Sequence, residues 1–114
     1  MVKKWSLYWV NHDPVQGSEQ SGVRPALIIS NDIVNETLPV VTILPVSSLK
    51  QDGRVYPTEV LLEKQLSGLP KHSLIMIHQI RTVSKLRIGK KCGEILDIRV
   101  KTAIIDTMKE YFEI

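Results

Sequence analysis

PVQGSEQSGVRP, residues 14–25, is a polar stretch with two glycines that leads directly into the apolar block ALII at 26–29. The proline that ends the stretch disfavours helical backbone at Arg24 and places this residue in extended geometry. The pattern therefore predicts a glycine-jointed loop that ends on an arginine held at the start of a buried strand. Glu19 and Gln20 lie on the mobile part of the loop, so we expect a lid of polar side chains over an anion-binding cation.

The 114-residue chain has the size and composition of one globular domain, with 43% hydrophobic and 24% charged residues. Its net charge of +3 permits binding to a nucleic acid or an acidic partner without establishing either. The single cysteine, Cys92, excludes an intrachain disulfide. The N-terminal run is too short and mixed for a signal peptide, and no apolar run reaches membrane-spanning length. We therefore expect a cytoplasmic protein without a membrane segment.

Strands are predicted on both sides of the loop. Residues 5–10 are aromatic and β-branched, and residues 25–30 are apolar on both faces, which is typical of a central strand. Further strands are expected at 39–46, 58–62, 73–83 and 91–95, the third of these runs giving one or two strands divided by a bulge. Because Pro45 cannot donate a ladder hydrogen bond, the end of its strand is expected at an edge or a bulge.

The hydrophobic period changes after Asp97. Apolar residues then recur on one helical face at Val100, Ile104, Met108 and Tyr111. This spacing predicts an amphipathic helix of about four turns with Asp97 as its N-cap. Shorter helical turns are expected within 31–38 and 84–88. The predicted architecture is mainly β with helices (α+β): five to seven short strands in a small curled barrel or open sheet, followed by a C-terminal helix.

Arg24 is the first candidate for chemistry, because a guanidinium offers a planar fork of donors that suits a phosphate or a carboxylate. Glu19, on the preceding loop, is a potential general base, a salt-bridge partner or a solvated carboxylate. Ser47 and Ser48 follow a predicted strand at once, where their hydroxyls would either orient a phosphate or form a turn.

The histidines and the cysteine give no indication of a metal site. The three histidines, His12, His72 and His78, lack metal-ligand spacing, and the lone cysteine has no companion. We expect His78 to share a strand face with Met76 and to be partly buried. The segment KLRIGKK at 85–91 holds four basic residues in seven, which form either a solvated cluster or a contact with a nucleic-acid backbone.

Three stretches together resemble the MazF/PemK family of toxin endoribonucleases. They are YWVNHDPVQGSEQSGVRPALIISND at 8–32, PVSS at 45–48 and HQIRTVSKLRIGK at 78–90, which span nearly the whole chain in the family's order. The resemblance implies a single domain over 1–114, a small SH3-like barrel of the MazF/PemK/CcdB type, and a homodimer. It also implies metal-independent, sequence-specific cleavage of single-stranded RNA by an mRNA interferase that needs no cofactor and is restrained by a cognate antitoxin.

The resemblance assigns roles residue by residue. Arg24 matches the family's catalytic arginine, Ser47 stands where the family usually has threonine, and Glu19 matches an acidic residue that acts as base or loop organiser. The implied reaction is attack of the RNA 2′-hydroxyl on the adjacent phosphorus, which yields a 2′,3′-cyclic phosphate and a 5′-hydroxyl. Contacts with the RNA are expected from Gly17, Ser18, Gln20, Ser48, His78 and Gln79.

Two departures from the family pattern bear on the mechanism. Met76 and His78 stand where some relatives have arginine and aspartate for the acid and base, and Ser84 stands where aspartate is common. His78 is an alternative base, because an imidazole titrates near neutral pH. Two other functions fit the same barrel: a CcdB-like poison that binds DNA gyrase without enzymatic activity, and an RNA-binding barrel that has lost activity. The GSEQSGVRP stretch favours the ribonuclease, because a gyrase poison would not require it.

Overall fold

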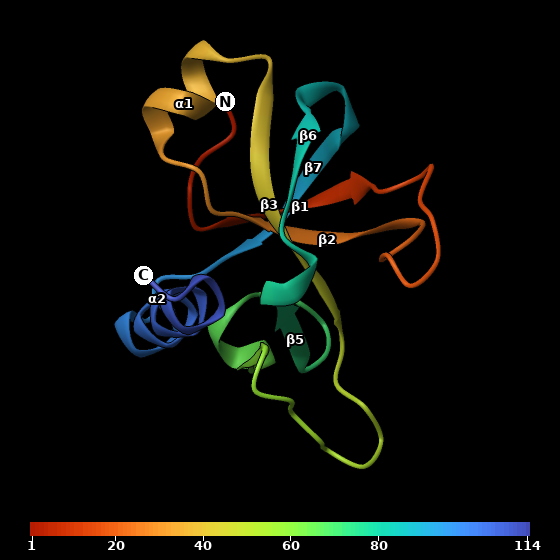
Figure 1. Cartoon of the computed structure of the whole chain (residues 1–114), viewed down its shortest axis with the longest axis vertical. Helices are drawn as coiled ribbons and strands as arrows, with labels where there is room; N and C mark the ends of the chain where they lie inside the picture. The colour runs from red at the N-terminus through yellow and green to blue at the C-terminus, as the bar shows by residue number, and fades with distance from the viewer.

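Seven antiparallel strands and two helices make up the fold in the computed structural model, which describes residues 1–114 (Figure 1). The strands are β1 (Ser6–Asn11), β2 (Val23–Ile28), β3 (Val40–Ser48), β4 (Glu59–Leu62), β5 (Ser73–Met76), β6 (Arg81–Ser84) and β7 (Ile88–Glu94). The helices are α1 (Asp32–Thr37) and α2 (Ile98–Phe112), and short 3₁₀ turns occur at η1 (Lys64–Leu66), η2 (Ile77–Gln79) and η3 (Lys85–Arg87). The predicted mainly β fold with a C-terminal helix is confirmed.

The strands form one sheet in the order β4-β5-β3-β2-β1-β7, and β6 pairs with β3 beside this path. The path ends at β4 and β7, so the sheet is open where a barrel would be closed.

β2 lies in the middle of the sheet because both of its faces are apolar. Leu27 faces Leu7 on β1, and Ala26 faces Pro45 on β3. Leu27 packs into a core that includes Val100 and Ile104 of α2, whereas its neighbour Ala26 packs into a second core on the other face. This two-sided burial fixes the position of the strand that carries Arg24, and the predicted central strand is confirmed.

β3 is an interior strand, and Pro45 lies where it changes partners. Residues 40–43 pair with β6, and residues 46–48 pair with β5. Pro45 falls between these two segments, where neither β5 nor β6 continues the ladder. Pro45 was expected at an edge or a bulge, but it lies at the gap between β6 and β5. The missing N–H of Pro45 is tolerated at this gap because no partner strand accepts a hydrogen bond there.

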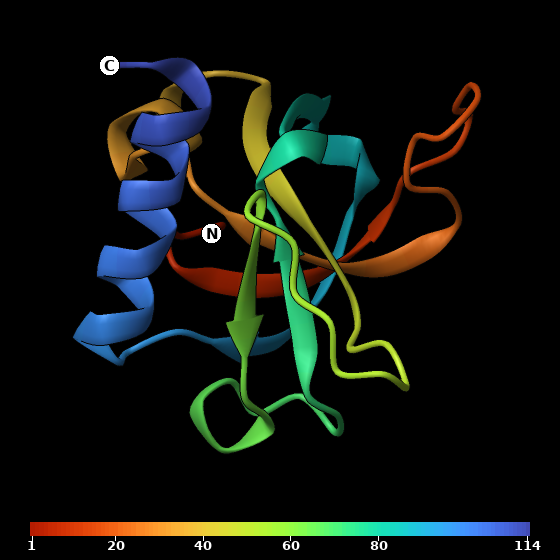
Figure 2. The ribbon, with the colours of Figure 1, turned by 60° about the horizontal axis from the view of Figure 1, so that its bottom comes forward.

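α2 begins as the sequence indicates, with the Asp97 carboxylate accepting the backbone N–H groups of Arg99 at 2.8 Å and Val100 at 3.3 Å. In both views the helix lies on one side of the sheet, and the loop between β1 and β2 projects on the opposite side (Figure 1, Figure 2). Neither helix has the length and apolar character that crossing a membrane would need.

The segment 73–83 differs from the expectation at its centre. It forms two strands, as one alternative had it, but they are divided by the 3₁₀ turn η2 instead of a bulge. Met76 ends β5 and is buried, whereas His78 lies on the turn and is exposed. The expectation of a partly buried His78 on the strand face of Met76 is therefore wrong, because the turn breaks the two-residue alternation of the strand.

Candidate active site

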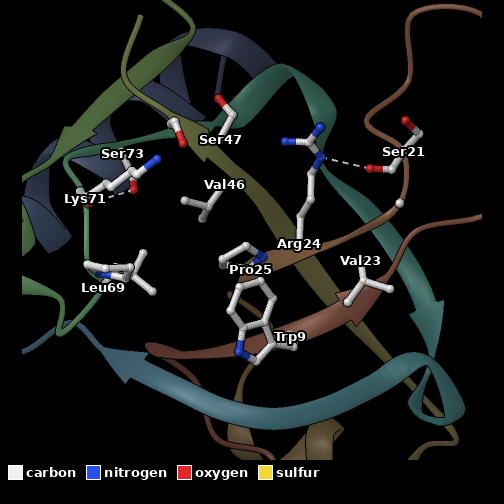
Figure 3. Close-up of a pocket in the computed structure, with 13 residues that line it drawn as sticks. Trp9, Ser21, Val23, Arg24, Pro25, Val46, Ser47, Leu69, Lys71 and Ser73 are labelled. Carbon is white, nitrogen blue, oxygen red and sulfur yellow. Dashed lines mark hydrogen bonds between the residues drawn. The ribbon is translucent and has the colours of Figure 1, made fainter.

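A cleft of about 450 Å³ opens between β2 and the end of β3 and contains Arg24, Ser47 and Ser48. We call it the Arg24 cleft; its thirteen lining residues are Trp9, Ser21, Gly22, Val23, Arg24, Pro25, Val46, Ser47, Ser48, Leu69, Pro70, Lys71 and Ser73 (Figure 3). None of them is acidic, and two are cations. The cleft therefore favours an anion that a guanidinium and hydroxyls can bind.

Arg24 extends from β2, opposite Val10 of β1, and its side chain is exposed. Its Nε donates to the backbone oxygen of Ser21 at 2.9 Å. With the Gln20 amide oriented so that its oxygen faces the guanidinium, Nη1 donates to that oxygen at 3.2 Å. Figure 3 shows the guanidinium between Ser21 and Ser47. The loop thus binds the Nε and Nη1 edge of the guanidinium, which orients the side chain and leaves Nη2 available to a ligand.

Ser47 and Ser48 end β3 beside β5, opposite Leu74 and Ser73. Ser47 is half-buried and Ser48 is exposed. Neither hydroxyl makes a hydrogen bond to the other residues drawn in Figure 3. Two hydroxyls that can donate or accept thus line the same cleft as the Arg24 guanidinium.

The loop between β1 and β2 is fastened to the 3₁₀ turn η2 by the amide of Gln79. Its Nε2 donates to the backbone oxygen of Ser18 at 3.1 Å, and its Oε1 accepts the N–H of Gln20 at 3.3 Å. Within the loop, the Glu19 carboxylate accepts the N–H of Gln16 at 2.6 Å. The expected lid is therefore braced by side chains at several points in this structure.

A second cleft, of about 330 Å³, is lined in part by the residues of this brace. We call it the His78 cleft; it is lined by Ser18, Glu19, Gln20, Pro45, His78, Gln79, Ile80 and Arg81. The predicted site residues thus divide between two clefts, and Gly17 lines neither. Gln20 joins the two, because it lines the His78 cleft and contacts the guanidinium of Arg24.

Sequence reasoning missed the residues that hold the base of the loop. His12 is fully buried; its N–H donates to Gly22 O at 2.9 Å, and its backbone oxygen accepts from Arg81 Nη1 at 3.0 Å. Arg87 Nη1 donates to the backbone oxygens of Asn11, at 3.1 Å, and of Asp13. Arg87 of the basic segment 85–91 therefore makes hydrogen bonds within the protein, and Lys91 of the same segment forms an ion pair with Glu94 at 3.5 Å.

His12 lies in an environment that disfavours its charged form. Burial is the main cause that lowers its pKa, and the charge of Arg81 is the second; Arg24 and Arg87 act in the same direction, and Asp13 opposes them. Its Nδ1 lies 3.2 Å from the carbonyl oxygen of Val10, and since a carbonyl only accepts, Nδ1 carries the proton. Nε2 is buried without a partner.

Comparisons with known proteins agree with this geometry. A family described as "PemK-like, MazF-like toxin of type II toxin-antitoxin system" matches residues 3–112. Endoribonuclease MazF of Staphylococcus saprophyticus is 37% identical over 101 residues, which cover 89% of this chain and 83% of the relative. Crystal structures of MazF (TM-score 0.84) and of MazE-MazF (TM-score 0.77) from Deinococcus radiodurans share the fold, each at 24% identity. They match 99% of this chain and 97% and 96% of theirs, respectively.

Proposed function

Because the chain belongs to the family of PemK-like, MazF-like toxins of type II toxin–antitoxin systems, we propose that it is a sequence-specific endoribonuclease. It cleaves single-stranded RNA, including mRNA, in the cytoplasm and without a metal ion or other cofactor. The observation that carries the proposal is the Arg24 cleft, which one oriented guanidinium lines together with the hydroxyl residues Ser47 and Ser48 and which contains no carboxylate. Such a cleft suits a phosphodiester.

The chemistry follows from what an RNA phosphodiester needs. The 2′-oxygen loses its proton and attacks the adjacent phosphorus, the bond from phosphorus to O5′ breaks, and O5′ gains a proton. The products are a 2′,3′-cyclic phosphate and a 5′-hydroxyl. Negative charge grows on the phosphoryl oxygens during this step, so a fixed donor aimed at them stabilises the transition state.

Arg24 is suited to supply that donor. Its Nε and Nη1 are used on the loop, so the guanidinium needs little reorganisation when the phosphate enters, and Nη2 donates to a phosphoryl oxygen. Ser47 donates its hydroxyl to a second phosphoryl oxygen and orients the group, in the role that threonine fills in most of the family. Ser48 lines the same cleft and adds a further donor.

The general base must lie within reach of the 2′-hydroxyl. Glu19 and His78 both line the neighbouring His78 cleft. One oxygen of Glu19 already accepts the Gln16 N–H at 2.6 Å. This contact favours the role of loop organiser for Glu19 and leaves the exposed His78 as the better base.

A pair of substitutions separates the two roles of Glu19. Glu19→Gln keeps an oxygen that can accept the Gln16 N–H but removes the basic carboxylate. We expect Glu19→Gln to retain cleavage within about 3-fold of wild type and Glu19→Ala to lose about 10-fold, because only the second loses the hydrogen bond that shapes the loop. Single-turnover cleavage rates of both variants provide the measurement. A Glu19→Gln protein as slow as Glu19→Ala would assign the base to Glu19 instead.

The proposed partners are an antitoxin protein and a second copy of the chain. A MazE-MazF complex is among the proteins that share this fold, and the net charge of +3 suits an acidic inhibitor. Apolar side chains at the two ends of α2 are exposed, among them Ile98 and Phe112. They provide surface that a homodimer would cover.

Incubation of the purified protein with mixed-sequence RNA in excess EDTA tests the proposal directly. We expect cleavage at a restricted set of sequences, with products that end in a 2′,3′-cyclic phosphate and begin with a 5′-hydroxyl. Mapping both ends of the products and repeating the reaction with added Mg²⁺ provide the measurement. Loss of cleavage in the chelator would contradict the metal-free mechanism. Binding without cleavage under all conditions would favour the inactive RNA-binding barrel.

A further inference from the structure

Trp9 is the largest exposed apolar side chain in the Arg24 cleft. Leu7, two residues earlier on the same face of β1, is completely buried, whereas Trp9 is 42% exposed. Figure 3 shows the indole face-on beneath Pro25, with its flat surface open towards the viewer. Exposing this much of an aromatic face to water has a cost that burial of the ring by a ligand would remove.

The sheet holds the indole in this position from both neighbouring strands. On one side Trp9 is paired with Pro25 of β2. On the other side the register of β7 shifts, since Tyr8 faces Lys91 and Val10 faces Ile88. Two residues, at 89 and 90, therefore lie opposite Trp9, as in a β-bulge, a device that redirects a side chain.

Gly89 of this bulge keeps the neighbourhood of Trp9 free of a further side chain. A Cβ on Gly89 would lie 3.1 Å from the Trp9 carbonyl oxygen and 3.6 Å from the Trp9 Cβ. The local backbone thus accommodates the tryptophan and adds no group that would compete with it.

The surroundings of the indole specify what could bind on it. Val46 and Leu69 are buried residues of the core beneath α2 and form an apolar wall of the cleft. The polar groups of the same cleft are Arg24, the serine hydroxyls and Lys71, an exposed lysine. A ligand that fills the whole cleft therefore has a flat apolar part for the indole and an anionic part for the cations, as a nucleotide does.

We propose that Trp9 is a substrate-binding residue, on which the base of one of the two nucleotides that share the scissile phosphate stacks. The inference rests on the proposed function and adds to it the group that holds the base. Stacking on an aromatic side chain is a common way in which proteins bind single-stranded RNA. In this geometry the phosphate lies at Arg24 and Ser47, and the base lies against Pro25 and Trp9 in the same cleft.

The test compares Trp9→Phe with Trp9→Leu on an RNA of the mapped cleavage sequence. Phenylalanine keeps an aromatic face, and leucine keeps only apolar bulk. We expect kcat/KM to fall about 10-fold or more for Trp9→Leu, mostly through KM, and only about 3-fold for Trp9→Phe, because a base stacked on an aromatic side chain contributes on that order. Equal losses in the two variants would indicate a packing role and would overturn the proposal.

A second measurement does not depend on how well these variants fold. In a Trp5→Phe protein, Trp9 is the sole tryptophan. Its fluorescence should change when the mapped RNA, made uncleavable by a 2′-O-methyl group at the attacked position, is bound. Removing the base on one side of the scissile phosphate should abolish this change and slow wild-type cleavage of the matching 2′-hydroxyl substrate. An unchanged fluorescence response to both abasic RNAs would overturn the proposal and leave Trp9 as a surface for a protein partner.

The controls separate this inference from the function on which it rests. If wild-type protein fails to cleave any RNA, the proposed function fails. If wild type cleaves and Trp9→Leu cleaves equally well, only the stacking proposal fails. The Trp5→Phe protein itself should cleave at the wild-type rate, because Trp5 packs against the core near α2 and lines neither cleft.

Discussion

Replacing Arg24 by alanine is expected to lower the rate of RNA cleavage by about 100-fold or more while leaving the fold intact. The guanidinium is the only group of the Arg24 cleft that is both charged and held by two hydrogen bonds from the loop. Removing it leaves the growing charge on the phosphoryl oxygens with the two serine hydroxyls and the untethered Lys71. Single-turnover rates at saturating enzyme, with RNA of the mapped sequence, measure the loss.

Two matched variants show whether the loss belongs to the site. Arg24→Lys keeps the charge but loses the planar fork and the Nε contact with Ser21, so we expect it to recover only part of the rate. Arg54→Ala removes an exposed arginine outside both clefts and should cleave within about 2-fold of wild type. Because Arg24 is exposed, its alanine variant should unfold at nearly the wild-type temperature. A fully active Arg24→Ala protein would show that the chemistry lies elsewhere.

Local patterns predicted those parts of the fold that depend on neighbours in sequence. The N-cap at Asp97 and the helical turn within 84–88 both appear, the latter with the Ser84 hydroxyl accepting the Leu86 N–H at 3.1 Å. The central position of β2 also followed from its sequence, because a strand apolar on both faces has to be covered on both. Each of these features depends on residues that are close in sequence or lie in a single strand, so it can be predicted without knowing which strands pair.

The arrangement of the candidate site depends on which strands pair. Local sequence patterns do not predict this pairing, so most of the arrangement could not be predicted from them. Arg24 and Ser47 share a cleft because β2 pairs with β3, and only the family resemblance joined them beforehand. The brace from Gln79 to Ser18 and Gln20 spans about sixty positions of sequence, with separations of 61 and 59. Gln79 was expected to contact RNA, and in this structure its amide bonds to the loop while the residue lines the His78 cleft.

His12 and Trp9 show two different reasons for a missed residue. His12 continues the alternation of Ser6, Tyr8 and Val10 on one face of β1, so extending that pattern by one step would have predicted its burial. Trp9 lies on the opposite face of β1, with Leu7. Its exposure depends on the register shift between β1 and β7, which no periodicity in either strand records.

Stability is expected to fall as the pH drops below about 6.5, because His12 is buried in its neutral form. Burial first, and Arg81 second, lower the pKa of His12 in the folded protein below its ordinary value of 6.5. In this pH range the unfolded chain therefore binds more protons than the folded one, so acid favours unfolding. The contribution is fully present above pH 6.5, declines below it by at most about 1.4 kcal/mol per pH unit, and levels off beneath the folded-state pKa.

The His12→Asn substitution isolates the pH-dependent contribution of His12 to the free energy of unfolding. Asparagine does not titrate, and its amide N–H can take the place of Nδ1 at the Val10 oxygen. We expect a lower stability at pH 8 than wild type, because the smaller side chain leaves a cavity, but a much flatter decline towards pH 5. Urea unfolding at a series of pH values measures both. His78→Asn, which alters an exposed histidine, should keep the wild-type pH dependence. The same steep decline in His12→Asn would assign the acid sensitivity to another group.

The position of His12 connects this titration to catalysis. Its backbone N–H and carbonyl oxygen hold the loop through Gly22 and Arg81, and the same loop orients Arg24 through Ser21 and Gln20. We therefore expect protonation of His12 to weaken the hold of the loop on Arg24. We expect wild-type cleavage to decline in acid more steeply than cleavage by His12→Asn. Parallel declines in the two proteins would show that the acid limb belongs to the catalytic groups and that the loop stays in place.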